Sequence, residues 1–521
     1  MKKRHWLRQL AIMATAVTTL LSFAIPASAA AATLPDTTSP RSLTIYKYDN
    51  VDDSVPYGEG LMDEVNTTVH RPMKNVIFDV YYYADLDSNV PKQISEQEAQ
   101  SWAASHSTAQ KATIVTDSTG KATWNAATGK SADGVYLVME RASRAIQYTG
   151  KTMPFFVSMP YTNPNEDGWV YDVVVQPKNE LVPGPEVNKD VTEIDQKHDS
   201  ARKDEPLTWI IRGDVPGDLY YTSAVNNGVV EFYADKYEFT DEIDSRLDYA
   251  GFVKMTIASR EGSEEFDIHD EGYTVSGTAK EGSAGGTLIV SLESKGMKEI
   301  MAHADDVSNY EIRAYFKTSI NDSGCTGDEI PNDVTLDYVN STGLSYDPVT
   351  VPEDKIPEVH TGGFKLVKVD VADNSNKLEG AEFHIAVSEE DALAGTFYKD
   401  YAGEEISVTT DANGEAGYTG IPFDNQSTDP DGGTYYYLVE TRAPEGFQLS
   451  SKPIRITVNA DTYRDTTVPY EVPNATKYDL PRAGGEGMTR YLLAGLGVMG
   501  IAAIAIGSTV VIHTGKKKKT V

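Results

Sequence analysis

Short runs in which apolar and polar residues alternate recur along the chain, and each run is bounded by turn-forming residues. Alternation with a period of two predicts a β-strand with one buried face. Many short strands close together in sequence are typical of a β-sandwich or barrel. The clearest runs cover residues 43–49, 135–140, 286–292, 310–316, 364–370 and 435–440. Helical patterns are few, at residues 95–104 and 389–394, so the pattern predicts an all-β fold.

Proline-rich segments and a weak internal repeat divide this pattern into three parts. Residues 181–185 and 348–357 are rich in proline, which fixes φ and removes a backbone donor, so both segments suit short, stiff linkers. Three runs of the first part recur in the same order in the last part, namely 43–49 as 364–370, 116–122 as 410–416, and 135–140 as 435–440. We therefore expect elongated, tandem immunoglobulin-like β-sandwich domains at 33–180, 186–350 and 361–475.

Both ends of the chain carry hydrophobic segments that are typical of export. A basic stretch, an apolar stretch and an A-x-A-like site within residues 1–31 predict a cleaved signal peptide. At the other end, an uncharged apolar stretch at 491–513 is followed by lysines at 516–519. This stretch is long enough to span a bilayer core of about 30 Å at ~1.5 Å per residue, and the lysines would hold its end on the cytoplasmic side.

A pentapeptide precedes this apolar stretch, with a short Gly-rich spacer between them. It consists of Leu480, Pro481, Arg482, Ala483 and Gly484. The pentapeptide resembles the sequence that sortase transpeptidases cleave, with Ala483 in place of the usual threonine. Residues 480–521 are therefore similar to a cell-wall sorting signal.

Composition narrows the possible chemistry. The formal net charge of −32 argues against nucleic-acid binding, which requires a basic face. The single cysteine, Cys325, cannot form a disulfide within the chain, so covalent reinforcement would need other chemistry. The acidic loops at 165–168 and 429–432 lack the ligand spacing of a dedicated calcium loop. We expect neither a metal nor a cofactor.

Residues 169–179 contain a further motif. Trp169, Val173, Val175, Pro177 and Lys178 match the pattern W-x-x-x-V-x-V-Y-P-K, in which glutamine stands here where tyrosine is usual. With the sorting signal and the tandem β-domains, this motif makes the chain resemble the major, or backbone, subunit of a sortase-assembled pilus of Gram-positive bacteria, built from Cna-type domains. The resemblance implies that the Lys178 ε-amine becomes joined to the Ala483 carbonyl of the next subunit. Strand alternation turns Lys178 away from Val173, Val175 and Asn179, and toward solvent if the valines point inward.

The resemblance also implies Lys–Asn isopeptide bonds inside such domains, each beside a buried acid. In the first domain the bond stays open, because some members of the family lack it there. Burial lowers the pKa of the lysine and raises that of the acid. A neutral amine then attacks the amide carbon, while the protonated acid hydrogen-bonds to the amide oxygen and polarises it. The expected sets of lysine, acid and asparagine are Lys368, Glu440 and Asn474 in the third domain, Lys189, Asp241 and Asn340 in the second, and Lys47, Glu140 and Asn179 in the first. Three alternatives stay open: Lys365 for Lys368, Asp244 for Asp241, and Asn332 for Asn340.

These features predict a structural, non-enzymatic subunit of a covalently polymerised surface pilus that supports adhesion. The expected partners are identical subunits, pilus-specific and housekeeping sortases, minor or tip pilins, and peptidoglycan; no pattern identifies a host-surface ligand. The expected location is secreted and covalently anchored to the cell wall, with a transient membrane anchor before sorting. The alternative is an individually wall-anchored adhesin or minor pilin with Cna-type domains. A sortase-anchored enzyme is disfavoured because the sequence lacks H-E-x-x-H, G-x-S-x-G and P-loop patterns.

Overall fold

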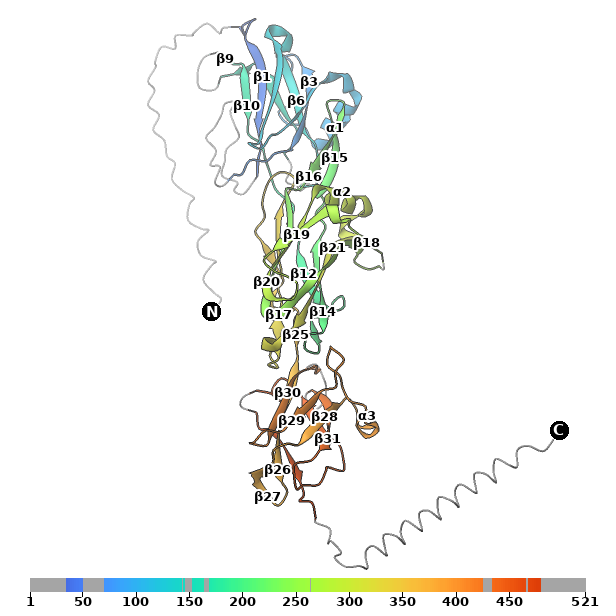
Figure 1. Ribbon diagram of the computed structural model, residues 1–521. Helices are drawn as coiled ribbons and strands as arrows, with labels where there is room; N and C mark the ends of the chain where they lie inside the picture. The colour runs from blue at the N-terminus through green and yellow to red at the C-terminus, as the bar shows by residue number, and fades with distance from the viewer. Residues whose placement is uncertain are drawn as a thin grey trace, which may run out of the picture.

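The computed structural model describes residues 34–49, 70–142, 144–145, 152–163, 168–262, 264–424, 433–464 and 467–478. Figure 1 shows three groups of strands that follow one another along a long axis. Each group has its own core of buried hydrophobic side chains, which includes Phe78 in the first group, Trp209 in the second and Phe383 in the third. Leu344 packs with the first core although it lies late in the chain. The prediction of an all-β chain of tandem β-sandwich domains is confirmed.

The first group packs two sheets against each other, with strand orders β10-β1-β5 and β4-β3-β6-β7. Its elements are β1 (Pro40–Tyr46), β2 (Tyr48–Asp49), β3 (Ile77–Ala84), α1 (Glu96–Ser105), β4 (Gln110–Val115), β5 (Lys121–Thr128), β6 (Gly134–Glu140), β7 (Phe155–Met159), β8 (Tyr161–Thr162), β9 (Trp169–Val170), β10 (Asp172–Val175) and β11 (Lys178–Asn179). Helix α1 begins after Ser95, which forms a capping box with Glu98. The first and last strands are parallel neighbours, β1 with β10 and β2 with β11.

The second group is built on one large sheet with the path β12-β14-β21-β17-β20-β19. Its elements are β12 (Val187–Val191), β13 (His198–Ser200), β14 (Pro206–Asp214), β15 (Tyr220–Val225), β16 (Gly228–Tyr233), β17 (Lys236–Ser259), β18 (Glu265–Asp267), β19 (Tyr273–Gly277), β20 (Ser283–Leu292), α2 (Ser294–His303), β21 (Tyr310–Ile320), β22 (Ile330–Pro331), β23 (Thr335–Val339), β24 (Val349–Thr350) and β25 (Glu358–His360). Strand β12 lies at an end of that path, and its pairing partner there is β14.

The third group again packs two sheets, β27-β26-β30 with β33 on β26, and β29-β28-β31-β32. Its elements are β26 (Gly362–Asp370), β27 (Asp373–Lys377), β28 (Glu382–Ala386), α3 (Glu389–Ala394), β29 (Ser407–Thr409), β30 (Glu415–Ile421), β31 (Thr434–Arg442), β32 (Ile454–Val458) and β33 (Tyr470–Asn474). As in the first group, the first and last strands, β26 and β33, pair in parallel.

Polar contacts join neighbouring groups in addition to the chain itself. Between the first and second groups, Lys74 Nζ lies 2.6 Å from an Asp235 carboxylate oxygen, and Asn75 Nδ2 donates to the Ser341 carbonyl at 2.7 Å. Between the second and third, the Ser200 hydroxyl accepts from the Phe423 N–H at 3.0 Å. These contacts fix how each group meets the next.

Candidate functional site

A buried cluster of three polar side chains lies in the core of the third group. Lys368 of β26, Glu440 of β31 and Asn474 of β33 are each at most 4% exposed. Lys368 Nζ lies 2.6 Å from Asn474 Oδ1 and 3.0 Å from Glu440 Oε1. Asn474 Nδ2 donates to the same glutamate oxygen at 2.8 Å. The three side chains therefore close a triangle of hydrogen bonds away from water.

Strand alternation explains why these residues point inward. On β26, Phe364, Leu366 and Lys368 are all fully buried. Lys365 lies on the other face, where its Nζ donates to the carbonyl of Arg464 at 3.2 Å. Of the two candidate lysines, the structure thus brings Lys368 to Glu440. A contact that the sequence did not reveal is the Ser450 N–H, which donates to Glu440 Oε2 at 2.6 Å and holds the carboxylate in place.

The first group contains a matching cluster. Lys47, between β1 and β2, places its Nζ 2.9 Å from Glu140 Oε2 and 2.6 Å from Asn179 Oδ1. Asn179 Nδ2 donates to the other glutamate oxygen, and all three side chains are buried. Thr152 also belongs to this cluster, because its hydroxyl accepts from Lys47 and its N–H donates to Asn179 Oδ1 at 2.8 Å. Sequence reasoning missed Thr152, which precedes strand β7 and follows no strand pattern.

In the second group, Lys189 of β12 and Asp241 of β17 meet inside the core. Both are buried, and Lys189 Nζ donates to Asp241 Oδ2. The same Nζ lies 3.1 Å from the carbonyl oxygen of Asp333. The residue before it, Asn332, is buried, and its amide lies beside the Asp241 carboxylate without a hydrogen bond of normal geometry. Lys189, Asp241 and Asn332 are therefore the lysine, acid and asparagine that this core brings together.

This placement corrects the expected triad, in which Asn340 was the partner of Lys189. Asn340 is buried, but its Oδ1 accepts from the backbone N–H groups of Thr342 and Leu344, at 3.1 and 3.0 Å. Its side chain therefore caps the turn that follows β23. Asp244, the alternative acid, pairs with Arg246 at 2.7 Å instead.

Burial changes the acid–base chemistry of these clusters. Removal from water lowers the pKa of Lys189 and raises the pKa of Asp241, and the same cause lowers the pKa of Lys368. A lowered lysine pKa favours the neutral amine, which is the nucleophilic form. A raised carboxyl pKa favours the form that carries a proton. In the second group, both shifts go in the direction that an amine–amide reaction requires.

The orientation of the amides indicates which step the acid can assist. In the first and third groups, the asparagine oxygen faces the lysine and the amide nitrogen faces the glutamate. The glutamate therefore lies against the nitrogen that would leave, which corrects the expectation that the acid polarises the amide oxygen. In that position, the carboxylate lies within hydrogen-bond distance of both the amine and the amide nitrogen, so it can pass a proton from the attacking amine to the departing nitrogen.

Lys178 begins β11 and pairs in parallel with Tyr48 of β2. Its side chain is partly buried, whereas that of the next residue, Asn179, is fully buried. Its carbonyl oxygen accepts from the Thr152 hydroxyl at 3.0 Å. The backbone of Lys178 is therefore tied to the same buried cluster that contains Lys47.

Several predicted features lie outside the described residues. They are the signal peptide at 1–31 and the sorting signal at 480–521, with Leu480, Pro481, Arg482, Ala483, Gly484 and the apolar stretch. Among the residues that the structure does describe, no helix is both long and apolar enough to cross a membrane. The same residues include no group of three or more His, Cys, Asp or Glu side chains placed to hold a metal ion.

Comparisons with known proteins match both ends of the described chain. The family described as Gram-positive pilin subunit D1, N-terminal domain, matches residues 39–180, and a prealbumin-like fold domain matches residues 362–471. The first part of the chain is therefore similar to the first domain of Gram-positive pilin subunits, and the last part to a prealbumin-like domain. These likenesses support a role as a structural, non-enzymatic subunit of a surface pilus.

Individual relatives match most of the chain. It is 26% identical to the fimbrial subunit type 1 of Actinomyces viscosus, over 92% of this chain and 90% of that protein. It is also 26% identical to the fimbrial subunit type 2 of Actinomyces naeslundii, over 74% of this chain and 70% of that protein. A solved structure, the full-length major pilin SpaD from Corynebacterium diphtheriae, is 21% identical and covers 85% of this chain and 98% of its own, with a TM-score of 0.42.

Proposed function

We propose that this pilin is the backbone subunit of its pilus, joined to the next copy by an amide bond between Lys178 Nζ and the carbonyl carbon of Ala483. The observation that carries the proposal is the position of Lys178. It lies on the last strand of the first group, tied to the buried Lys47 cluster and a few residues before the linker to the second group. A subunit attached at Lys178 would pull directly on the second and third groups.

Sortases would make this bond and end the polymer. A pilus-specific sortase cleaves between Ala483 and Gly484, holds the chain as an acyl-enzyme, and transfers it to the Lys178 amine of the next copy. A housekeeping sortase transfers the last subunit to peptidoglycan, so that the pilus is anchored to the cell wall. Minor or tip pilins complete the fibre. The partly exposed side chain of Lys178 supports access by an enzyme.

The three buried clusters would each form an internal isopeptide bond. The neutral lysine Nζ attacks Cγ of the asparagine, the new Nζ–Cγ bond forms, and the Cγ–Nδ2 bond breaks. The nitrogen leaves as ammonia after it gains one proton, while the lysine loses one proton, so the acid ends as it began. Hydrogen-bond distances of 2.6 Å between Nζ and Oδ1 in two clusters support this reaction, because reactants held in place react far faster than free ones.

The role of Lys178 is tested by wall extracts resolved on SDS gels and probed for this protein. The wild type should give a ladder of high-molecular-weight polymers, and Lys178→Ala should remove it while the monomer is still exported and anchored. Lys178→Arg keeps the positive charge without an amine nucleophile, and should also remove the ladder. Lys111→Ala, at an exposed strand position of the same domain, is the matched control and should leave the ladder intact. A single wild-type band would favour the individually anchored adhesin.

The choice between the two asparagines of the second group is tested by peptide mapping. Asn332→Ala should abolish the cross-linked peptide that contains Lys189, because the attacked carbonyl is removed. Asn340→Ala should keep that peptide and cost only about 1 kcal/mol of folding stability through the lost turn cap. If instead Asn340→Ala removes the cross-link and Asn332→Ala keeps it, the placement of Asn332 is refuted.

A further inference from the structure

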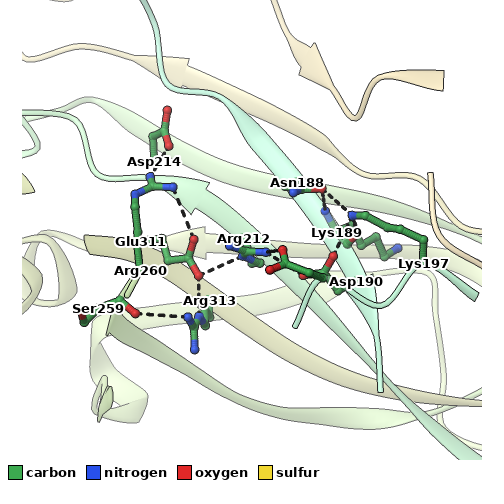
Figure 2. Close-up of polar contacts among 11 residues, drawn as sticks. Asn188, Lys189, Asp190, Lys197, Arg212, Asp214, Ser259, Arg260, Glu311 and Arg313 are labelled. Atoms are coloured by element: carbon green, nitrogen blue, oxygen red, sulfur yellow. Dashed lines mark hydrogen bonds and ion pairs between the residues drawn. The ribbon is translucent and has the colours of Figure 1, made fainter. Parts of the chain in front are cut away.

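Lys197 makes three contacts with the strand that carries Lys189. Its Nζ donates at 2.7 Å to Asn188 Oδ1, at 2.7 Å to Asp190 Oδ1, and to the carbonyl oxygen of Lys189 itself. A lysine ammonium has three N–H donors, so these contacts use all of them. Figure 2 shows the Lys197 side chain reaching across to residues 188–190 of β12. The Lys197 side chain thus binds the backbone of Lys189 and the side chains of both neighbouring residues.

The position of strand β12 in its sheet explains why contacts from Lys197 would stabilise it. It lies at an end of its sheet path, paired there with β14, and it must hold the Lys189 side chain fully buried. Burial of an ionisable group is unfavourable, as the lowered pKa of Lys189 indicates. Before any covalent bond exists, an edge strand with a buried lysine would spend part of its time detached. Contacts on the outer face oppose that detachment.

Lys197 also connects this strand to the segment that positions the other reactant. The carbonyl of Lys197 accepts from the N–H of Glu358 at 2.8 Å, at the start of β25. The residue before Glu358 is Pro357, whose carbonyl accepts from the N–H of Asn332 at 2.9 Å. Two adjacent residues, 357 and 358, therefore hold the backbones of both Lys197 and Asn332. A short chain of contacts runs from the lysine that would attack to the amide that would be attacked.

Arg212, on the neighbouring strand β14, also forms an ion pair with strand β12. Asp190 is fully buried and lies between Lys197 and Arg212, whose Nη1 is 3.0 Å from Asp190 Oδ2. Arg212 continues to Glu311 at 2.9 Å, and Glu311 to Arg313 at 2.7 Å. Figure 2 shows these ion pairs running across the sheet as a ladder. Asp190 therefore anchors β12 to the neighbouring strands and gives Lys197 a fixed acceptor.

We propose that Lys197 is a positioning residue for the isopeptide bond of the second domain: it holds the Lys189 backbone against the segment that carries Asn332, so that Nζ stays within reach of the amide. This inference rests on the proposed bond between Lys189 and Asn332. It assigns Lys197 no part in bond making, because its ammonium contacts the outer face of β12, whereas the Lys189 side chain points into the core. Its effect is on how often the reactants meet.

The test follows bond formation in the full mature chain after a pulse of synthesis, by mass spectrometry of the cross-linked Lys189–Asn332 peptide. Lys197→Met keeps the aliphatic stem and removes the ammonium. It should slow formation of this cross-link by about tenfold or more, since three charge-assisted contacts are lost, while the cross-links of the other two domains form at the wild-type rate. Lys254→Met is the matched control, because its ion-pair partners Glu265 and Asp267 lie on β18 and not on β12.

A second background separates positioning from general stability. With Lys189→Ala no bond can form, and the thermal unfolding of Lys189→Ala and of Lys189→Ala/Lys197→Met shows whether the second domain stays folded without the Lys197 contacts. We expect it to stay folded, so that the slow cross-linking of Lys197→Met reflects misplacement. If that domain unfolds, Asn188→Ala, which removes one of the three acceptors, should still slow the bond measurably.

Four results would be decisive, three of them against the positioning role and one against the proposed bond. Cross-linking at the wild-type rate in Lys197→Met overturns the positioning role, as does cross-linking at the wild-type rate in Asn188→Ala. Slowing by the same factor in Lys254→Met also overturns it. Absence of the Lys189–Asn332 peptide from the wild-type chain refutes the proposed bond itself. It does not affect the proposed role of Lys178, which the ladder of polymers tests.

Discussion

The intact mature chain should weigh about 51 Da less than its sequence requires, because each of the three proposed isopeptide bonds would release one ammonia of about 17 Da. The structure supports three bonds, since each group of strands holds a buried lysine, acid and asparagine together. Glu440→Gln keeps the shape of the third cluster but cannot supply a carboxyl proton. Relative to its own sequence mass, this variant should therefore fall short by about 34 Da, again at about 17 Da for each remaining bond. High-resolution mass spectrometry of the purified chain measures both values.

The Glu440→Gln variant should also show a large fall in the free energy of unfolding of the third domain. A cross-link that closes a loop of about 100 residues stabilises a domain by about 5 kcal/mol in the chain-entropy account, and Lys368 and Asn474 are 106 positions apart. For a domain of this size, that loss corresponds to a fall in Tm of about 20 °C or more. Lys365→Ala, on the opposite face of β26, is the control and should change neither mass deficit nor Tm appreciably. A wild-type mass equal to the sequence mass would refute all three bonds.

Under force, the third domain of the wild type should not extend when a single molecule is pulled between residues near Lys178 and the end of the described chain. Strands β26 and β33 are parallel neighbours, so a pull on the start of one and the end of the other shears them. Backbone hydrogen bonds contribute only about 0.5–1.5 kcal/mol each net, whereas an amide between Lys368 and Asn474 cannot separate. The first domain lies largely off this path, because force enters at its last strand.

Lys368→Ala should convert the third domain into an extensible one. The 106 positions between Lys368 and Asn474 become available, which adds about 350 Å of contour length at ~3.3 Å per residue. Force–extension curves from atomic force microscopy or optical tweezers measure this increment. Lys365→Ala should add none. A wild-type molecule that already shows the increment would mean that the bond is absent from the third domain.

The sequence predicted correctly which side chains of a strand are buried where alternation along that strand was enough to tell its two faces apart. The alternation of Phe364, Leu366 and Lys368 placed the lysine in the core, and the same reasoning put Lys365 outside, as the structure has both. Helix α3 follows residues 389–394 as expected, and α1 begins at its capping serine. Helix α2 (Ser294–His303) was not predicted, because it contains Gly296 and no side chain caps its start.

What the sequence determined by itself was which residues point into each core, because the two-residue period of a strand is a local property of the chain. It could not determine which residues meet across that core. Asn332 lies between β22 and β23, outside any strand, so no alternation marks it. Its N–H donates to the carbonyl of Pro357, directly before β25, and this tertiary contact helps to hold it in the second core. Asn340 had the right local pattern, yet the turn after β23 uses its side chain as a cap. The contact of Lys197 with Lys189 likewise depends on the fold. Its acceptor is the backbone carbonyl of Lys189, a group that every residue has and that no sequence pattern distinguishes.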